Sequence, residues 1–324
     1  MSADAGNHRS ILLGHPIVLL GASGMLGRAW RELLERERAA PICPEMTELD
    51  LSASNGASCV TPERLASIID GHRDHARSNA ASPTDATATT PIVINAAAYT
   101  DVDRAESDEG AARAINALGV ARLAAACRAI GATLVHYSTD YVFDGHSSEP
   151  YRTDHPRTPI NAYGRTKGEG EEAIEQEIAH GLDAILIRTS WLYAPWGRNF
   201  VRTIARLARE KNMLRVVDDQ RGRPTSAEHL ARCSLALLDA RARGIFHVTD
   251  GGACSWFELA RFVVETLGLP CVVEPCTTSE FPRPAPRPAW SVLDLAGTER
   301  LLGPMPPWTD NVRDVLARLE HEPD

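Results

Sequence analysis

Tyr163 and Lys167, four residues apart, are the residues of this sequence whose types and spacing point most sharply to chemistry. At this spacing on a helix, two side chains lie on one face, one turn apart. A free tyrosine has a pKa of about 10 and is a poor acid–base group near neutral pH, but a neighbouring ammonium favours the phenolate and lowers that pKa. The pair can then exchange a proton with a carbinol oxygen. The same spacing also arises by chance on solvated helices. The neighbouring sequence must therefore show whether this pair is catalytic.

Upstream of this pair, an apolar run at residues 134–138 predicts a strand that ends at Thr139. The Thr139 hydroxyl can hydrogen-bond the same substrate oxygen as Tyr163. A threonine, a tyrosine and a lysine around a nicotinamide are the groups needed for hydride transfer to a ketone. We therefore expect Thr139, Tyr163 and Lys167 to be catalytic.

Gly21, Gly24 and Gly27 lie between a short apolar run and an amphipathic segment. In this layout glycines permit a tight turn and close approach of backbone to a pyrophosphate, which meets the N-terminus of the following helix. Small residues after a later apolar run, Ala97 and Ala98, let a flat cofactor pass close to the sheet, although small residues also pack under helices. We expect a dinucleotide site here. The G-x-x-G-x-x-G spacing resembles that of the short-chain dehydrogenase/reductase superfamily.

The elements that must position these residues alternate in type. Residues 16–20 predict a first strand, and a helix follows to about residue 38. A second strand is expected to end around residues 43–46. Further strands are predicted at 92–95, 133–137 and 184–187, with an amphipathic helix at 111–130. This alternation is typical of an α/β fold, here a Rossmann-type doubly wound parallel sheet with a smaller C-terminal α/β substrate-binding domain.

The chain divides into parts of different character. Residues 1–15 are expected to form a flexible leader, and 16–190 the NAD(P)-binding Rossmann domain. Residues 72–90 are polar and poor in large apolar groups, which predicts a surface insertion within that domain. Residues 191–324 are expected to be mainly substrate-binding, with some return to the Rossmann core.

Composition excludes several classes of partner. The chain has 324 residues and a formal net charge of −9, which argues against nucleic acid or an anionic membrane as the main partner. Its seven cysteines are scattered and contain no C-x-x-C pair. This argues against a disulfide framework or a zinc site and fits a reducing cytoplasm. No apolar run reaches the about 18 residues of a membrane span.

Taken together, the motifs resemble one family, the dTDP-4-dehydrorhamnose reductases, which are extended short-chain dehydrogenase/reductases. The matching blocks span nearly the whole chain in the family's order: residues 21–27, 95–106 (NAAAYTDVDRAE), 136–145 (HYSTDYVFDG), 159–167 (PINAYGRTK), 188–193 (RTSWLY), 219–225 (DQRGRPT), and a late R-P-x-x-S-x-L motif that begins at Arg287. This agreement is far more specific than any single motif.

The resemblance implies a role for each matched position. Tyr163 resembles the proton donor, Lys167 its partner and a ligand of the cofactor ribose, and Thr139 the hydroxyl that tunes the site. The implied substrate contacts are Thr139, Asp140, Trp191, Asn199 and Arg287. The implied cofactor contacts, which include the glycines and the catalytic pair, are Gly21, Ser23, Gly24, Met25, Leu26, Gly27, Asp50, Leu51, Ala97, Ala98, Tyr99, Thr100, Tyr163 and Lys167.

The family's reaction reduces the 4-keto group of dTDP-4-dehydro-L-rhamnose, a precursor of cell-surface polysaccharide. Its diphosphate needs local cations, and the candidates are Arg221, Arg223, Arg283 and, preferred for its matched motif, Arg287. The resemblance favours NADPH. NADH stays open, because Glu45 near the end of the second strand would suit a ribose 2′-hydroxyl, whereas Arg28 would suit a 2′-phosphate.

Some family members bind Mg²⁺ through glutamates at a dimer interface. One of those glutamates falls near Ala29, which cannot ligate a metal, and Glu228 alone makes a poor site. We therefore expect no metal and a monomer or weak homodimer.

Three other functions are found in the same superfamily or on the same fold. A 4,6-dehydratase of the same superfamily would carry a glutamate after Asp140, where this chain has Tyr141. A reductase of another 4-keto nucleotide sugar stays open. The fold also serves as a non-catalytic regulatory subunit of methionine adenosyltransferase, which the joint presence of Thr139, Tyr163 and Lys167 argues against.

Overall fold

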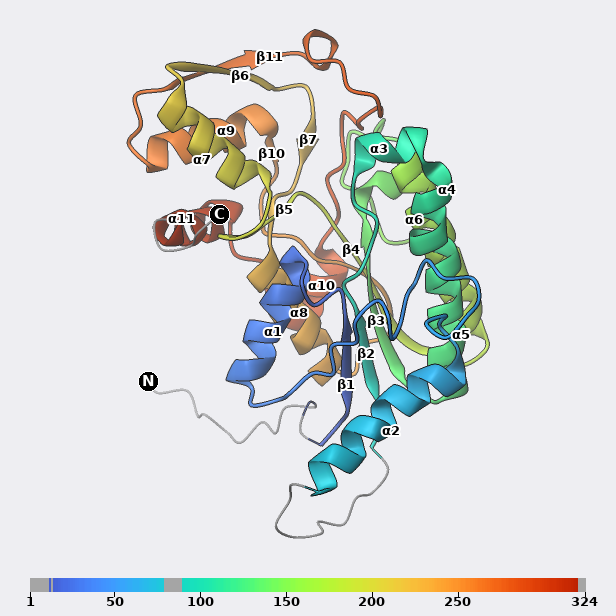
Figure 1. Ribbon diagram of the computed structural model, residues 1–324. Helices are drawn as coiled ribbons and strands as arrows, with labels where there is room; N and C mark the ends of the chain where they lie inside the picture. The colour runs from blue at the N-terminus through green and yellow to red at the C-terminus, as the bar shows by residue number, and fades with distance from the viewer. Residues whose placement is uncertain (1–11, 13, 79–88, 320–324) are drawn as a thin grey trace.

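The computed structural model describes residues 12, 14–78 and 89–319, with backbone alone for 73–78. Its central sheet has five parallel strands in the order β1-β2-β3-β4-β9, with helices on both faces (Figure 1). The strands are β1 (Ile17–Leu20), β2 (Ile92–Asn95), β3 (Thr133–Thr139), β4 (Asp183–Thr189) and β9 (Gly244–His247). The predicted doubly wound parallel sheet is confirmed.

Side-chain alternation along the strands divides the core into two layers. In β1, Ile17 and Leu19 enter one apolar cluster, whereas Val18 and Leu20 enter another on the opposite face, as the period of two along a strand requires. One face is covered by α1 (Met25–Arg36), α8 (Ala227–Asp239) and α10 (Ala296–Leu302). The other is covered by α2 (Pro62–Ser78), α5 (Val120–Ala129) and α6 (Ala162–Ala179). Both faces are apolar, so both must be covered.

The predicted helix at 111–130 is a composite. It consists of α4 (Glu109–Arg113), a π-helical segment η1 (Ala114–Gly119) and α5 in succession. The short helix α3 (Val102–Ser107) precedes it. The π turn lies where Asn116 faces inward, with its side-chain amide bonded to the backbone of Tyr99, in keeping with the tendency of such turns to mark sites.

The predicted second strand is not a strand. Only an isolated bridge joins Ile42 to Val18 of β1, because Pro41 and Pro44 on either side of it withhold backbone donors. The bridge still shows the path of the chain: it lies beside β1 on the side opposite β2. The chain therefore leads first to one side of β1 and then to the other, all in parallel orientation. Ligand crevices in such sheets open at the carboxyl ends of the strands where the strand order reverses in this way.

A smaller α/β unit covers the carboxyl ends of the sheet. It contains α7 (Phe200–Glu210), β6 (Met213–Val217), α9 (Trp256–Thr266), β11 (Val272–Cys276) and α11 (Trp308–Arg318), which share one apolar core, and it lies above the sheet in Figure 1. Two short strand pairs lie at its junction with the Rossmann body: β5 (Leu192–Tyr193) with β8 (Thr225–Ser226), and β7 (Arg221–Gly222) with β10 (Cys254–Ser255). Two 3-10 turns complete the structure, η2 (Asp140–Val142) and η3 (Thr278–Glu280). Between these parts, α8 and β9 return to the Rossmann sheet.

Two predicted segments lie partly outside the described residues. Of the leader at 1–15, Leu12 is described and is 2% exposed in the core, and the His15 ring bonds the Thr90 carbonyl. Of the insertion at 72–90, residues 72–78 continue α2. Residues 1–11, 13 and 79–88 are outside the described chain.

Candidate active site

The glycine loop leaves no room for side chains between β1 and the segment after β2. A Cβ on Gly21, whose φ is +73°, would lie 2.6 Å from the backbone nitrogen of Ala97. A Cβ on Gly27 would collide with the Gly21 carbonyl oxygen. Helix α1 starts after Gly24 with no side-chain cap and no acidic residue in its first turn, so its first N–H groups are open to an anion. This cradle fits the pyrophosphate of a dinucleotide.

A cleft of about 640 Å³ runs from the glycine loop to the smaller unit. It brings together most of the predicted site residues, which are spread over 170 positions of the sequence: Gly21, Ser23, Gly24, Met25, Leu26, Ala97, Ala98, Thr100, Thr139, Asp140, Tyr163, Lys167 and Trp191. The three predicted catalytic residues therefore share one cavity with most of the predicted cofactor residues.

Helix α6 carries Tyr163 and Lys167 against the end of β3. The Asn161 side chain caps the helix by accepting from the Gly164 N–H at 2.7 Å. Gly164, between the two catalytic candidates, must be small because a Cβ there would collide with the Tyr141 carbonyl oxygen. The predicted placement of both side chains on one helix, one turn apart, is confirmed.

Tyr163 is a protonated phenol at neutral pH. Burial and the neighbouring Asp140 raise its pKa to about 12, and a hydrogen bond with Thr139 acts in the opposite direction. The expected lowering of this pKa by Lys167 is not seen, because burial penalises the phenolate and is the largest influence on the group. A protonated tyrosine is ready to donate a proton, as the reduction of a ketone requires.

Asp140 is a buried carboxyl group beside the tyrosine. Its Oδ1 accepts a hydrogen bond from the Thr139 hydroxyl at 3.0 Å, and the same hydroxyl accepts from the Tyr141 N–H at 3.2 Å. Its Oδ2 is buried and makes no hydrogen bond of good geometry among the described residues, although the Ser291 side chain lies near enough to lower the pKa of the carboxyl group. Burial raises the pKa of Asp140 to about 7. An unpaired buried oxygen next to the reacting groups suits a hydroxyl of a sugar ligand.

Lys167 points at the backbone of β3 and is only 2% exposed. Its Nζ donates to the Tyr137 carbonyl oxygen at 2.6 Å and lies 3.4 Å from His136 Nε2. Burial lowers the pKa of Lys167 to about 8, and the charge of Glu171 counteracts that fall. The lysine therefore keeps its charge at neutral pH through an acid one turn further along α6.

Trp191 forms one wall of the cleft in a strained conformation. Its φ is +47°, a region that bulky residues rarely adopt. The indole stacks on Trp256 with ring centroids 3.5 Å apart and lies against Gly222, where a Cβ would come within 2.6 Å of the ring. The surroundings thus fix an aromatic face at the cleft.

Several predicted residues lie outside the cleft lining. Gly27 packs under the glycine loop, and Leu51 is buried, its carbonyl accepting from Arg122. The Asp50 carboxylate accepts from the backbone and hydroxyl of Ser52. Tyr99 is held through its backbone by Asn116.

Asn199 caps a helix. Its Oδ1 accepts from the Arg202 N–H at 3.1 Å and its Nδ2 donates to the Ala194 carbonyl at 2.9 Å. The side chain that we expected on the substrate is thus engaged in starting α7.

The arginines expected to hold a diphosphate are mostly paired with acids. Asp103 of α3 binds both Arg283 and Arg287, which lowers the pKa of Asp103 to about 2 despite its partial burial. Arg221 pairs with Glu258 at 3.0 Å. Ser190, Arg198 and Trp256 line the cleft and were not predicted. Of these, Arg198 is an exposed cation with no ion pair among those that the structure describes; nothing in its local sequence marks it.

Arginines surround Glu228, the one carboxylate that matches a Mg²⁺ ligand of some family members. Glu228 Oε2 accepts from Arg318 at 2.7 Å, and its Oε1 lies 3.5 Å from Arg36. Ala29 is buried in the core. Because guanidinium groups already neutralise the only matched carboxylate, these residues do not fit a divalent cation.

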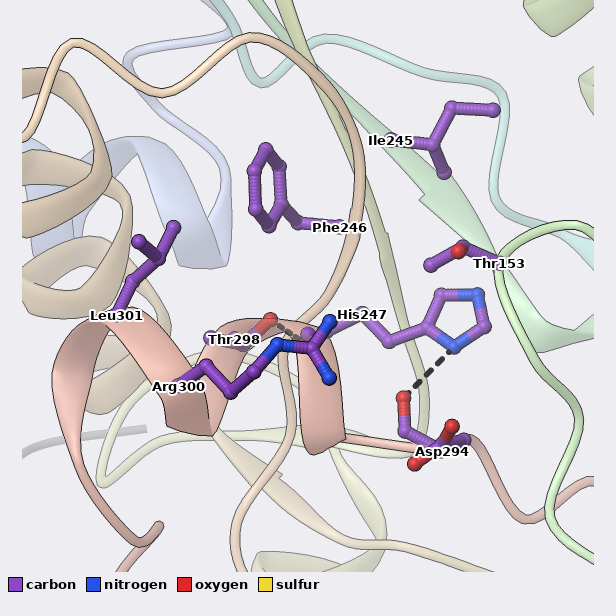
Figure 2. A pocket seen from close by; sticks show the side chains of 9 residues that line it. Thr153, Ile245, Phe246, His247, Asp294, Thr298, Arg300 and Leu301 are labelled. Carbon is purple, nitrogen blue, oxygen red and sulfur yellow. Dashed lines mark hydrogen bonds between the residues drawn. The ribbon is translucent and has the colours of Figure 1, made fainter.

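A second cavity of about 300 Å³ lies beside β9, the edge strand of the sheet, and is lined by Thr153, His247, Asp294 and Arg300, among others (Figure 2). The His247 ring bonds the Asp294 carbonyl at 3.1 Å, and the Thr298 hydroxyl donates to the His247 carbonyl at 2.6 Å. Burial and the charge of Arg188 lower the pKa of His247 to about 3. The polar side chains His247 and Thr298 of this cavity bond backbone carbonyls and so stabilise the fold. The cleft is therefore the better candidate site.

Known proteins resemble this chain along most of its length. A family model described as the RmlD substrate binding domain matches residues 15–321. The chain is 40% identical over 283 residues to a dTDP-4-dehydrorhamnose reductase of Streptomyces griseus, covering 86% of this chain and 84% of that one. It is 37% identical over 306 residues to a dTDP-4-keto-6-deoxy-D-glucose reductase of Streptomyces niveus, covering 93% and 96%.

A solved structure agrees. The dTDP-4-dehydrorhamnose reductase from Bacillus anthracis str. Ames, in complex with NADP, superimposes with a TM-score of 0.80 and 32% identity, covering 94% of this chain and 99% of that chain. Among the described residues, none of the helices combines the length and the apolar character needed to cross a membrane.

Proposed function

The chain belongs to the family of the RmlD substrate binding domain, and from that premise we propose that it reduces the 4-keto group of dTDP-4-dehydro-L-rhamnose to give dTDP-L-rhamnose, with NADPH as reductant. Membership, with named reductases among its relatives, makes the chain an oxidoreductase. The observation that carries the proposal is the meeting of Thr139, Tyr163 and Lys167 with the glycine loop in one cleft.

The bound cofactor supplies a hydride to the carbonyl carbon; the side chains of this protein handle the proton. Tyr163, neutral and buried, donates its proton to the carbonyl oxygen as negative charge develops there. The Thr139 hydroxyl helps to orient that oxygen. Lys167 holds a positive charge one turn away, which stabilises the phenolate left after the transfer.

The sugar nucleotide is recognised by two kinds of group. The unpaired Oδ2 of Asp140 accepts from a sugar hydroxyl, and the fixed indole of Trp191 offers a flat apolar face beside it. Arg198 at the cleft is the best placed cation for the diphosphate, because Arg283 and Arg287 are committed to Asp103. These assignments replace Asn199 and Arg287 as substrate contacts.

NADPH is favoured over NADH by the NADP complex of the Bacillus anthracis relative. Arg28, the expected partner of a 2′-phosphate, instead pairs with Glu32 and lies over the Trp196 ring. Arg31 of the same helix is exposed. Its charge acts to lower the pKa of the Cys43 thiol, so Arg31 lies near the segment that follows the Ile42 bridge. We therefore assign the 2′-phosphate to Arg31.

A second candidate, a reductase of another 4-keto nucleotide sugar, is supported by the near-equal likeness to the dTDP-4-keto-6-deoxy-D-glucose reductase. A panel of 4-keto nucleotide sugars, with NADPH consumption followed by absorbance, separates the two. Turnover with dTDP-4-dehydro-L-rhamnose at a kcat/KM at least about tenfold above the others, a difference of about 1.4 kcal/mol in transition-state binding, supports the first; the reverse order supports the second.

We expect this enzyme to act in the reducing cytoplasm as a monomer or weak homodimer. All seven cysteines are free thiols, as is usual in a reducing compartment. The arginine pairs around Glu228 leave no place for a metal bridge between subunits, so light scattering at micromolar concentration should give the mass of one chain.

A further inference from the structure

A cysteine, a histidine and an aspartate outside the cleft stand in a hydrogen-bonded row. Cys233 Sγ lies 3.1 Å from His229 Nε2, and His229 Nδ1 lies 2.7 Å from Asp250 Oδ1. His229 and Cys233 are one turn apart on α8, and Asp250 follows β9. None of the three lines the cleft, and the proposed reduction uses none of them.

Both carboxylate oxygens of the aspartate accept hydrogen bonds from surrounding donors. Its Oδ2 accepts from the Tyr193 hydroxyl at 2.6 Å and from the Ser226 N–H at 3.1 Å. Its Oδ1 accepts from Asn311 Nδ2 at 2.8 Å as well as from His229. Because the carboxylate oxygens accept from all these donors, the His229 ring presents Nδ1–H to Oδ1 as a further donor.

This arrangement turns the other ring nitrogen toward the sulfur. With its proton on Nδ1, His229 has a lone pair on Nε2, which faces Cys233 and can take the thiol proton. Burial works against a charged ring, yet hydrogen bonds with Asp250 and Cys233 raise the pKa of His229 to about 9. A thiolate beside an imidazolium is the reactive form of cysteine.

We propose that Cys233 is a modification site, an activated thiol that small peroxides oxidise to a sulfenic acid. The thiol proton passes to His229 Nε2, and the sulfur, giving up two electrons, forms an S–O bond as the O–O bond of hydrogen peroxide breaks. The leaving hydroxide takes the proton from His229 and departs as water. The oxidant comes from solution, so the step balances without a second protein group.

Access to the sulfur is limited to small reagents. Cys233 and the neighbouring Met305 are each 8% exposed, with their sulfur atoms 4.0 Å apart. Two other cysteines, Cys59 and Cys271, are each 7% exposed, but their thiols contact backbone carbonyls instead of an imidazole. They are matched controls for exposure within the same molecule.

Among the described residues, two tyrosines interact with this group of side chains besides His229 and Asp250. Burial raises the pKa of Tyr137, and the charge of Cys233 raises it further. Burial and the charge of Asp250 raise the pKa of Tyr193. Both phenols stay neutral across the range in which a thiol titrates. A pH dependence of Cys233 reactivity between pH 5 and 9 therefore reports the cysteine–histidine pair.

The test uses the full-length protein with substoichiometric hydrogen peroxide. At each time point an aliquot is unfolded in denaturant that contains dimedone, which traps sulfenic acid whatever its burial, and the yield at each cysteine is measured by peptide mass spectrometry. At pH 7 an ordinary thiol with a pKa near 8.5 is only about 3% thiolate. We therefore expect Cys233 to react at least about tenfold faster than Cys59 and Cys271, after allowing for the lower nucleophilicity of a more acidic thiol.

Two further measurements decide the role of the histidine. His229→Gln should bring the Cys233 rate within about threefold of the controls, since the amide is no base. In the unmodified protein, which needs no variant to fold, the Cys233 rate should fall less steeply from pH 8 to pH 6 than the control rates, because His229 Nε2 faces the sulfur. Equal rates for the three cysteines, an unchanged rate in His229→Gln, or a parallel fall with pH would each overturn the proposal.

Discussion

Replacing Glu171 by glutamine removes the anion that anchors the catalytic helix. Glu171 lies one turn beyond Lys167 on α6 and is fully buried, as is Arg188 of β4 (side chains 0% and 1% exposed). The guanidinium holds the carboxylate through Nε to Oε1 at 2.9 Å and Nη2 to Oε2 at 2.7 Å, and Arg157 adds a contact at 3.2 Å. Glutamine keeps the shape but leaves the Arg188 charge buried without an anion.

The size of the effect follows from that burial. Breaking a buried ion pair by removing one partner costs about 3–5 kcal/mol. With an unfolding entropy of about 2 cal/mol/K per residue, the 324-residue chain should lose about 4–7 °C in Tm. Glu169→Gln is the matched control on the same helix, because Glu169 and its partner Arg113 are 40% and 52% exposed and such a pair is worth at most about 1 kcal/mol.

The same substitution changes the pH profile. The charge of Glu171 raises the pKa of Lys167, which burial lowers to about 8, so without that charge the lysine loses its proton at a lower pH. Calorimetry gives the Tm values, and NADPH consumption gives kcat/KM from pH 6 to 10. If Glu171→Gln and Glu169→Gln melt within 1–2 °C of each other, a gap of at most about 1 kcal/mol, the anchoring role is refuted.

Three further outcomes follow from the site. In the unmodified enzyme, kcat/KM should fall about tenfold per pH unit above about pH 8. The reason is that burial lowers the pKa of Lys167 to about 8 and that catalysis needs the charged lysine. A profile flat to pH 9.5 would contradict this. Dialysis against EDTA should leave activity and elution volume unchanged, because Arg36 and Arg318 neutralise Glu228; loss of activity restored by Mg²⁺ would show a metal site. Asn199→Ala should lower stability by about 1 kcal/mol, as loss of a helix cap does, while KM for the sugar nucleotide stays within twofold; a tenfold rise in KM would return Asn199 to the substrate.

The parts of the site that depend on local spacing could be predicted from the sequence. The glycine loop and the pair Tyr163 and Lys167 are each set by a few consecutive residues and by the geometry of one turn. The order of β1, β2, β3 and β4 follows from the same alternation of apolar runs and helices. Families preserve such local patterns, which is why they carry the resemblance.

The parts that depend on distant partners could not be predicted. Arg287 looked free for a diphosphate, but its partner Asp103 lies 184 positions away. The pKa of Tyr163 depends on burial, which no spacing reveals, and burial reverses the expected direction of its shift. Cys233 and His229 show helical spacing in the sequence, but only the fold brings Asp250 to them.

The central claim is that Tyr163 protonates a ketone of a nucleotide sugar in the cleft beneath Trp191. Its most direct test is the single-turnover rate of NADPH oxidation with dTDP-4-dehydro-L-rhamnose, for the unmodified enzyme and for Tyr163→Phe, with NADPH affinity measured by fluorescence in both. We expect the single-turnover rate to be lower by about 10²–10⁴ in Tyr163→Phe, with nearly unchanged NADPH affinity. An unchanged rate in Tyr163→Phe would contradict it.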